Sequence, residues 1–250
     1  MNDLTPERLS WAMGDRRYEY HPTIGSTNDR AMALLREGAP SGMVVLADEQ
    51  TAGRGRLGRS WHSPTGSALM LSVILRPAAS AQSRIGMLGA LMVCDAVEAS
   101  GVEQTGIKWP NDVQIDGRKV CGILPEADWQ GETLTGVVLG MGINVRVNFA
   151  GSPLEGAAIS LSEVVSDIDR AALLRSLLER LDFWTPQLGS DALFAAWERR
   201  LNMIGKTVSI AAQGESLHGK AIGVDRDGAL RIRGQDGAVR RAVAGDLALG

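Results

Sequence analysis

The sequence predicts an α+β protein with two regions, a larger one that mixes strands with helices and a small antiparallel β-barrel after it. As far as about Asn202, apolar runs of strand length alternate with segments of helical period. Beyond Asn202 the pattern changes to short strands at the spacing of a small barrel. Their turn signals are Gln213-Gly214, Asp227-Gly228 and Asp236-Gly237. We therefore predict one domain over residues 1–202 and a second over residues 203–250.

A strand and a capped helix are predicted near the N-terminal end. Residues 16–21 alternate weakly in polarity, which indicates a strand. Residues 26–29 are Ser-Thr-Asn-Asp, all favoured helix-capping residues, and residues 30–37 have a helical period that ends at Gly38. A helix start presents hydroxyls and free backbone N–H groups together, so capping and ligand contact are compatible here.

Two predicted strands, residues 43–47 and 68–75, bracket a loop rich in glycine and arginine. The loop, Gly53 to Trp61, is GRGRLGRSW, with Gln50 just before it. Glycines permit positive φ, and guanidinium groups match the geometry of phosphate or carboxylate oxygens. The loop therefore indicates an anion-binding site. Taken alone, such a basic run is also typical of a solvated surface loop.

The loop also satisfies the pattern GxGxxG, which is typical of dinucleotide-binding proteins. That fingerprint requires a helix that opens directly from the glycine-rich turn. Pro64 and Gly66 would break such a helix almost at once. We therefore reject a dinucleotide-binding fold.

A buried helix and a hairpin are predicted in the middle of the chain. Residues 85–99 are apolar on nearly every face, as in a buried helix. Residues 106–124 contain the run KWPNDV, followed by Asp116-Gly117 between apolar-flanked segments, which is a strong signal for a tight turn. This turn places Lys119 early on the returning strand, beside the KWPND run.

A glycine-bearing strand and two helices complete the larger region. Residues 133–147 continue as strand, and Gly140 and Gly142 within it indicate a bulge or a close approach to the backbone. Asn144 follows on the same strand. The amphipathic helices are predicted at residues 169–184 and 192–200.

The composition is that of an ordinary soluble globular protein. Hydrophobic residues make up 44% and charged residues 22%, and the formal net charge of -3 argues against a general nucleic-acid binder. No run reaches the roughly 18 apolar residues of a membrane span, and no secretory signal is seen, so we expect a cytoplasmic protein. Cys94 and Cys121 are expected to be reduced thiols. His21, His62 and His218 lack ligand spacing, so we expect no zinc site.

From about Tyr18 to its end the chain resembles biotin protein ligase. The resemblance depends on five segments: Ser26-Thr27-Asn28, Gln50 with GRGRLGRSW, KWPNDV, Lys119 with Gly122-Ile123-Leu124, and Gly140-Met141-Gly142-Ile143-Asn144. The loop followed by KWPND at this separation is specific, whereas each piece alone is weak. The resemblance implies a mixed sheet flanked by helices, similar to the class II aminoacyl-tRNA synthetases, and an SH3-like barrel after it.

The resemblance also implies an activity. Members of the family activate biotin with ATP and Mg²⁺ to biotinyl-5′-adenylate and pass biotin to one lysine of a biotin carboxyl carrier protein or domain of acetyl-CoA carboxylase or a related carboxylase. Some members begin with a DNA-binding helix-turn-helix and act as repressors. Only 25 residues precede Ser26 here, so we expect the ligase without the repressor. We expect a monomer or homodimer that binds neither nucleic acid nor membrane.

The resemblance assigns the site residues. The catalytic residues are Lys119 and Arg54. The biotin-binding residues are Ser26, Thr27, Asn28, Gln50, Gly53, Arg54, Gly55, Arg56, Lys119, Gly122 and Gly140. The ATP-binding residues are Arg54, Arg56, Trp61, Asn111, Lys119 and Asn144. The candidate magnesium ligands are Asp112 and Asn144, although Asp112 could equally hold a neighbouring lysine or the turn after Pro110.

Two other functions stay open. A lipoate ligase or octanoyltransferase shares the catalytic fold, and octanoyltransferases use a cysteine nucleophile, for which Cys121 beside Lys119 is the candidate. A small buried hydrophobe is the ordinary role for such a cysteine. A protein that binds biotin or its adenylate without catalysis is the second alternative.

Overall fold

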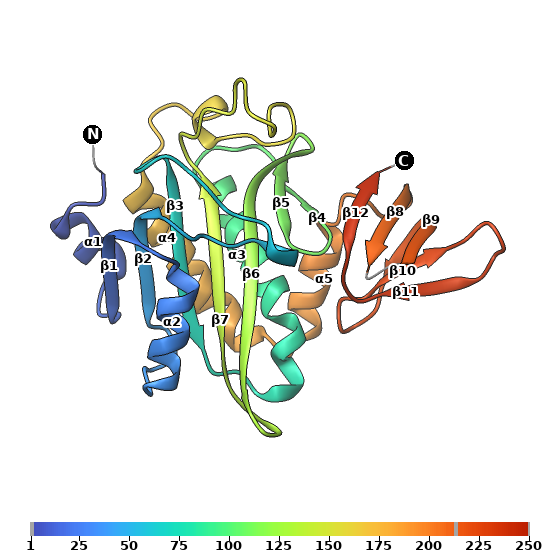
Figure 1. Cartoon of the computed structure of the whole chain (residues 1–250), viewed down its shortest axis with the longest axis horizontal. Helices are drawn as coiled ribbons and strands as arrows, with labels where there is room; N and C mark the ends of the chain where they lie inside the picture. The colour runs from blue at the N-terminus through green and yellow to red at the C-terminus, as the bar shows by residue number, and fades with distance from the viewer. Residues whose placement is uncertain (1–2, 213–214, 250) are drawn as a thin grey trace.

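A seven-stranded mixed sheet forms the centre of the larger region (Figure 1). The protein is described by a computed structural model over residues 3–212 and 215–249. The strand order is β1-β2-β3-β7-β6-β5-β4, and all neighbours are antiparallel except β1 and β2. The strands are β1 (Tyr18–Ile24), β2 (Val44–Gln50), β3 (Ala68–Leu75), β4 (Gly106–Lys108), β5 (Asp112–Ile115), β6 (Arg118–Gln130) and β7 (Thr133–Asn144). The expected mixed sheet is therefore confirmed.

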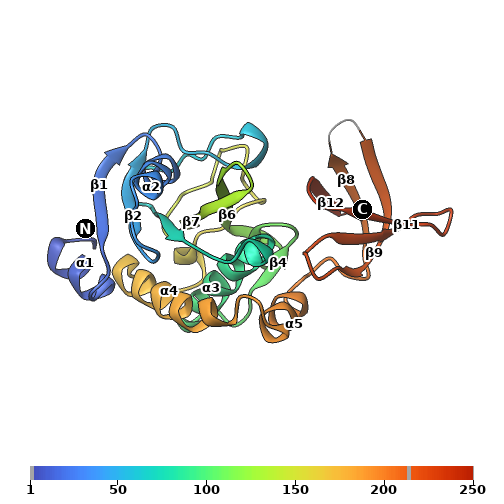
Figure 2. The same ribbon diagram turned by 90° about the horizontal axis from the view of Figure 1, so that it is seen from below.

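Helices cover both faces of this sheet (Figure 2). The α-helices are α1 (Pro6–Met13), α2 (Thr27–Arg36), α3 (Ile85–Ala99), α4 (Arg170–Trp184) and α5 (Asp191–Arg199). Helix α2 packs on β2, β3 and β7 from one side, and α3 packs on β5, β6 and β7 from the other, with α4 and α5 against it. The short 3₁₀ helices are η1 (Arg56–Gly58), η2 (Ala79–Arg84), η3 (Leu161–Glu163) and η4 (Thr185–Gln187).

The burial of these elements explains their apolar sequences. Every residue of β3 is buried, because α2 packs on one face of the strand and the other face joins the main core cluster, which includes residues of α3 and α4. Helix α3 spans the predicted residues and buries eleven of its fifteen. An apolar run without periodicity is what elements covered on every side require.

The predicted cap and hairpin turn are both present. The Ser26 hydroxyl oxygen accepts a hydrogen bond from the Asp29 backbone N–H at 3.3 Å, so Ser26 is the N-cap of α2. Asp116 and Gly117 have φ of +49° and +76°, and they join β5 to β6. Positive φ at both central residues is the conformation that Asp-Gly favours in two-residue hairpins. Helix α1, which begins at Thr5-Pro6, was not predicted.

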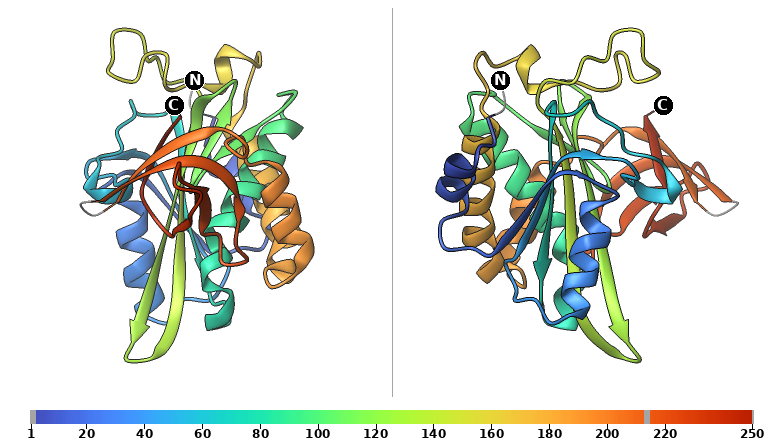
Figure 3. Two further views of the ribbon diagram at one scale, coloured as in Figure 1. Left: turned by 90° about the vertical axis from the view of Figure 1, so that its right-hand side faces the viewer. Right: turned by 60° about the vertical axis from the view of Figure 1, so that its left-hand side comes forward.

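The C-terminal region forms a five-stranded antiparallel sheet (Figure 3). Its strands are β8 (Thr207–Ala212), β9 (Glu215–Val224), β10 (Leu230–Arg233), β11 (Val239–Ala242) and β12 (Asp246–Leu249), in the order β11-β10-β9-β8-β12. The turns at Asp227-Gly228 and Asp236-Gly237 are confirmed, with positive φ at both glycines. The predicted Gln213-Gly214 turn lies outside the described residues. Among the described strands β11 and β12 do not pair, so the antiparallel sheet is confirmed and its closure into a barrel is not.

Several contacts join the C-terminal sheet to the larger region, among them the ion pair of Arg226 with Asp191 on α5. The Trp109 indole N–H donates to the Gly228 carbonyl at 2.8 Å, and Trp109 is almost fully buried. Arg56 donates to the Gly245 carbonyl at 3.3 Å, and Arg59 pairs with Asp246. None of the helices in residues 3–212 and 215–249 has the length and apolarity of a membrane span.

Candidate active site

A cavity of about 480 Å³ lies on the α2 side of the large sheet. It is bounded by the start of α2, by β6 and β7, by the arginine loop (residues 53–61) and by the beginning of β12. Leu154, Ala157 and Ala158 also line it. In Figure 1 the arginine loop crosses in front of β7 and β6 and extends towards the C-terminal sheet. Segments distant in sequence therefore meet around one space.

Every predicted site residue except Gly53 lines this cavity. The lining members of the predicted set are Ser26, Thr27, Asn28, Gln50, Arg54, Gly55, Arg56, Trp61, Asn111, Asp112, Lys119, Gly122, Gly140 and Asn144. Gly53 instead closes the base of the loop, where its carbonyl accepts from the Trp61 N–H at 2.9 Å. A Cβ at Gly53 would lie 2.5 Å from the Trp61 carbonyl oxygen, so the loop can close only with glycine at this position.

The start of α2 presents a buried network of polar side chains. The Gln50 side-chain oxygen accepts from the Thr27 backbone N–H at 2.7 Å and from the Thr27 hydroxyl at 3.1 Å. The Ser72 hydroxyl lies 2.8 Å from the Thr27 hydroxyl oxygen and 2.6 Å from the Asn28 side-chain oxygen. Ser72 was not predicted, although it is the one polar residue in the apolar run of β3. These bonds within the protein fix the polar groups in place.

Asn28 fills the space that Gly140 leaves open. A Cβ at Gly140 would lie 2.2 Å from the Asn28 side-chain oxygen. The Asn28 amide N–H₂ donates to Glu126 at 2.6 Å and to the Leu124 carbonyl at 3.2 Å. The sequence indicated a close approach at this glycine, and the structure identifies the approaching group.

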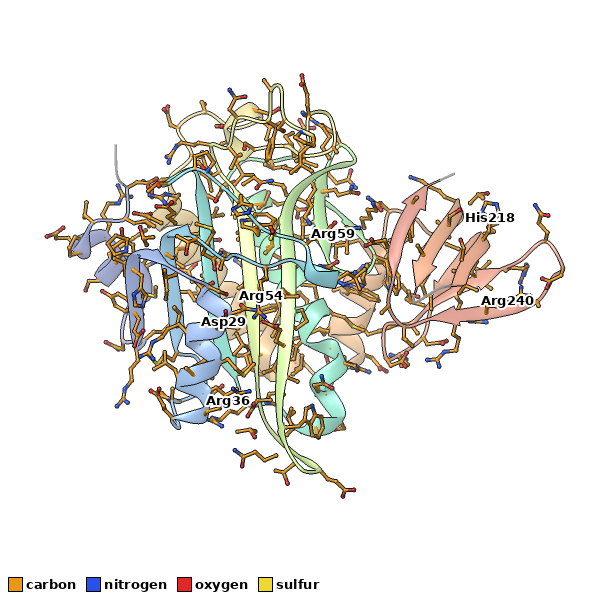
Figure 4. The ribbon with its side chains drawn as sticks, viewed as in Figure 1. Asp29, Arg36, Arg54, Arg59, His218 and Arg240 are labelled. Atoms are coloured by element: carbon orange, nitrogen blue, oxygen red, sulfur yellow. The ribbon has the colours of Figure 1, made fainter. Side chains whose placement is uncertain are left out.

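The arginines of the loop point in different directions. Arg54 donates to Asp29 at 2.6 Å and to Glu126 at 3.0 Å, and Figure 4 shows Arg54 beside Asp29. Arg56 donates to the Asn111 side-chain oxygen at 3.0 Å, and among the described residues it forms no ion pair. Burial lowers the pKa of the Arg56 guanidinium. Such a group remains charged at neutral pH, so Arg56 offers the cavity a cation without a bonded carboxylate.

Lys119 lies next to a carboxylate and an aromatic ring. Its ammonium nitrogen is 2.7 Å from the Asp112 carboxylate and 5.7 Å from the centroid of the Trp61 ring. A Cβ at Gly122 would lie 3.1 Å from that nitrogen, and one at Gly142 would lie 2.7 Å from the Trp61 ring. The two glycines therefore make room for Lys119 and Trp61. The indole N–H of Trp61 has no hydrogen-bond partner among the described residues.

Asn111 and Asn144 are held by the protein itself. The Asn111 amide donates to the Ile123 carbonyl at 2.6 Å, while its oxygen accepts from Arg56. The Asn144 amide donates to the carbonyls of Lys119 and Ile159, both at 3.2 Å. Both asparagines therefore position the segments that carry Arg56 and Lys119.

Asp112 fits a magnesium site better than Asn144 does. Magnesium in nucleotide sites keeps waters and takes one or two carboxylates besides the phosphate oxygens. Asp112 offers a carboxylate to the cavity, beside Lys119. Asn144 is buried, and its amide nitrogen is committed to backbone carbonyls.

Comparisons with known proteins identify the family. Residues 20–144 match the Biotin/lipoate A/B protein ligase family, and residues 203–250 match the Biotin protein ligase C terminal domain. Over 241 residues the chain is 36% identical to the Bifunctional ligase/repressor BirA of Bacillus spizizenii, which covers 92% of this chain and 73% of the relative. The chain belongs to the biotin protein ligase family.

Other members of the biotin protein ligase family agree in sequence and in structure. The chain is 34% identical over 227 residues to a biotin acetyl-CoA-carboxylase ligase of Paracoccus denitrificans, which covers 85% of this chain and 92% of the relative. The biotin protein ligase of Aquifex aeolicus, solved in complex with biotin and ATP, superposes with a TM-score of 0.78 at 26% identity. That comparison covers 94% of this chain and 98% of the Aquifex chain.

The geometry does not support Cys121 as a nucleophile in this member of the biotin protein ligase family. Cys121 is fully buried and does not line the cavity. Burial raises the pKa of its thiol far above the ordinary value, and the charge of Lys119 opposes this only in part. The thiolate is the reactive form of cysteine, so Cys121 behaves as a small hydrophobic residue.

In this member of the biotin protein ligase family, three carboxylates that bind the loop arginines were not predicted from the sequence. Asp29 and Glu126 bind Arg54, and Asp246 binds Arg59. Their sequence separations from the arginines, 25, 72 and 187 residues, leave no local pattern that could reveal the pairs. The cavity is also lined by Leu154, Ala157 and Ala158 and by residues 245–247.

Proposed function

We propose that the chain is a biotin protein ligase that converts biotin and MgATP to biotinyl-5′-adenylate, releases pyrophosphate, and transfers biotin to one lysine of a biotin carboxyl carrier protein or domain. The observation that carries this proposal is the convergence of Arg56, Lys119 and the polar start of α2 on one cavity. The relatives named as ligases and the similar structure with biotin and ATP support it.

The first step joins two anions, so cations are needed near both. An oxygen of the biotin carboxylate attacks the α-phosphorus, a new P–O bond forms, and the bond to the departing pyrophosphate breaks. In this proposal Lys119 and Arg56 offset the repulsion and stabilise charge that develops on the phosphoryl oxygens. A lysine suits this place because its compact charge can follow a moving oxygen. Asp112, 2.7 Å from the Lys119 ammonium, keeps that group oriented.

Recognition of the neutral ureido ring is assigned to the polar start of α2. The ring offers one carbonyl acceptor and two N–H donors. The Ser26 hydroxyl oxygen accepts from a backbone N–H, so its own proton is left for a ligand carbonyl. Thr27 and Gln50 supply further polar atoms at fixed positions. A site built in this way discriminates strongly, because an analogue without these groups would leave buried polar atoms unpaired.

In the second step the amine of the acceptor lysine attacks the acyl carbon of the adenylate, and AMP leaves. The adenylate is a mixed anhydride, which bulk water can hydrolyse. In this proposal the arginine loop, which lines the cavity, provides the cover that this intermediate requires.

Further details belong to the same proposal. Mg²⁺ would be held by Asp112 together with ATP phosphate oxygens, where it would neutralise phosphate charge.

The five C-terminal strands are proposed to be an SH3-like unit, and the division of the chain into domains between residues 202 and 203 remains a prediction. We propose ligase activity without repressor activity, which the net charge of -3 supports. A cytoplasmic location, a monomeric or homodimeric state and a carboxylase as acceptor complete the proposal.

One experiment tests the function directly. The purified protein is mixed with biotin, MgATP and a carrier domain, and covalent biotin on that domain is detected with an avidin reagent. Pyrophosphate release is followed in the same mixture. Biotinylated carrier with pyrophosphate is the expected result. Biotin binding without pyrophosphate release would instead identify a sensor, and absence of both would contradict the proposal.

A further inference from the structure

Glu126, on β6, connects the predicted biotin pocket to the arginine loop. One of its carboxylate oxygens accepts from the Asn28 amide at 2.6 Å and from Arg54 at 3.0 Å. Asp29 binds the same Arg54 nitrogen at 2.6 Å. We call Asp29, Glu126 and Arg54 the Arg54 ion-pair cluster. Its three members come from α2, β6 and the arginine loop, so the cluster ties these three elements together.

We propose that Glu126 is a positioning residue that couples the pocket to the loop. It fixes the Asn28 amide inside the pocket, and together with Asp29 it holds Arg54 so that the arginine loop stays over the cavity. This inference rests on the proposed function for its effect on biotin. The effect on the loop itself does not, because every contact in the cluster is between side chains of the protein.

The charges support a positioning role for Arg54. Two carboxylates already bind its guanidinium, so the cluster carries a formal charge of about -1 and is unsuited to receive a further anion. Arg56 and Lys119 remain as the cations for the carboxylate and phosphates. The predicted catalytic role of Arg54 is therefore replaced here by a role in holding the loop.

Glu126 also determines the orientation of the Asn28 side-chain amide. The Asn28 side-chain oxygen faces the Ser72 hydroxyl at 2.6 Å, and its nitrogen faces Glu126. A carboxylate accepts hydrogen bonds and donates none, so it permits only the amide nitrogen at this place. The same carboxylate oxygen meets the loop, so movement of Arg54 changes the partners of a group that orients Asn28.

The first test measures how readily a protease cleaves the arginine loop in the protein without added ligand. Glu126→Gln preserves the shape and an acceptor for Asn28 but removes the charge that Arg54 faces. Cleavage after Arg56 by a trypsin-like protease is expected to accelerate roughly fivefold, because loss of a partly exposed ion pair weakens the contact by about 1 kcal/mol. Glu132→Gln, at the exposed tip of the same β6–β7 hairpin, is the matched control and is expected to cleave like the wild type.

A double-mutant cycle separates the ion pair from independent roles. Arg54→Gln, Glu126→Gln and the double variant are compared for cleavage after Arg56 and, by calorimetry, for biotin affinity. If Arg54 acts through Glu126, each single change weakens biotin binding roughly fivefold and the double change does little more. If the two effects multiply instead, Arg54 acts independently of Glu126 and the inference is wrong.

The two readouts distinguish failure of the inference from failure of the function. Unchanged cleavage in Glu126→Gln, with normal biotin ligation by the wild type, would overturn the inference and leave the function standing. Accelerated cleavage together with a wild type that neither binds nor ligates biotin would leave the loop contact standing and overturn the function. A shift of the thermal midpoint in Glu126→Gln without faster cleavage would indicate a purely structural role and also overturn the inference.

Discussion

The side-chain oxygen of Asn28 lies so close to Gly140 that a Cβ on this residue would be only 2.2 Å from it. Asn28 cannot retreat freely, because Ser72 and Glu126 hold the two ends of its amide. The pocket at the start of α2 therefore depends on a missing side chain on β7.

Replacing Gly140 with alanine is expected to weaken biotin binding roughly 10- to 100-fold. The added methyl group displaces the Asn28 amide from both partners, and overpacking of this kind costs about 1–3 kcal/mol. Calorimetric titration with biotin measures the loss. Gly189→Ala is the control, since no atom lies within 4 Å of the added carbon there. Equal affinity of Gly140→Ala and wild type would show that Asn28 does not order the pocket.

Lys119→Ala is expected to slow adenylate formation on the order of 10²- to 10³-fold while biotin still binds. The reason is loss of the cation that stabilises charge on the phosphoryl oxygens. Pyrophosphate release gives the rate, and calorimetry gives the binding. Lys220→Ala, an exposed lysine on β9, serves as the comparison variant. Near-normal turnover in Lys119→Ala would remove this residue from the mechanism.

Asp246→Asn is expected to loosen the arginine loop with little change in stability. The Arg59 side chain is 66% exposed, and exposed ion pairs contribute about 0–1 kcal/mol. Cleavage by a trypsin-like protease should nevertheless increase, because Asp246 is one of the contacts that hold the loop against the C-terminal sheet. Asp236→Asn, at a distant turn of the same sheet, provides the control. A cleavage pattern identical to the wild type would rule out this contact as a restraint.

Cys121→Ser is expected to retain ligation activity, and the native thiols are expected to resist alkylation at neutral pH. Burial raises the pKa of Cys94 to about 12 and that of Cys121 higher still, so little thiolate forms. Mass spectrometry after treatment with iodoacetamide measures the modification. Loss of activity in a folded Cys121→Ser protein would reopen the octanoyltransferase alternative.

Acid stability is expected to depend on Glu19. The hydrogen bond from Arg30 lowers the pKa of this carboxyl to about 2, below its ordinary value of 4.5. The ionised form therefore stabilises the fold at pH values above the ordinary pKa of 4.5. This contribution disappears as the pH falls towards about 2. Denaturation at several pH values gives the free energy of unfolding. Between about pH 4.5 and pH 2 this free energy should change less in Glu19→Gln than in the wild type or in the exposed-site control Glu103→Gln. Parallel curves for all three proteins would contradict the assignment.

Much of the fold follows from local patterns. Residues 85–99 and the Asp116-Gly117 turn are in the structure where the sequence predicts them, because burial and backbone conformation constrain their residue types directly. Helix α1 was missed even though Thr5-Pro6 is a start signal of the ordinary kind. The closed barrel was predicted from strand spacing, which does not determine whether the edge strands pair.

The sequence predicted which residues line the candidate site, but it did not predict which partners their side chains bind. The glycine and arginine pattern pointed to Arg54, Arg56 and Lys119, and all three line one cavity. What each side chain binds depends on tertiary contacts. Nothing near Arg54 in the sequence indicates that Glu126, 72 residues away, will face it.

Trp61 gives this protein a built-in optical reporter. Its indole lies against Gly142 inside the cavity, with an N–H that has no partner within the described part of the chain. Trp109, the other lining tryptophan, is fixed to the Gly228 carbonyl and almost fully buried. Occupancy of the cavity should therefore alter the emission of Trp61 in particular, which would let binding be followed by intrinsic fluorescence without a label.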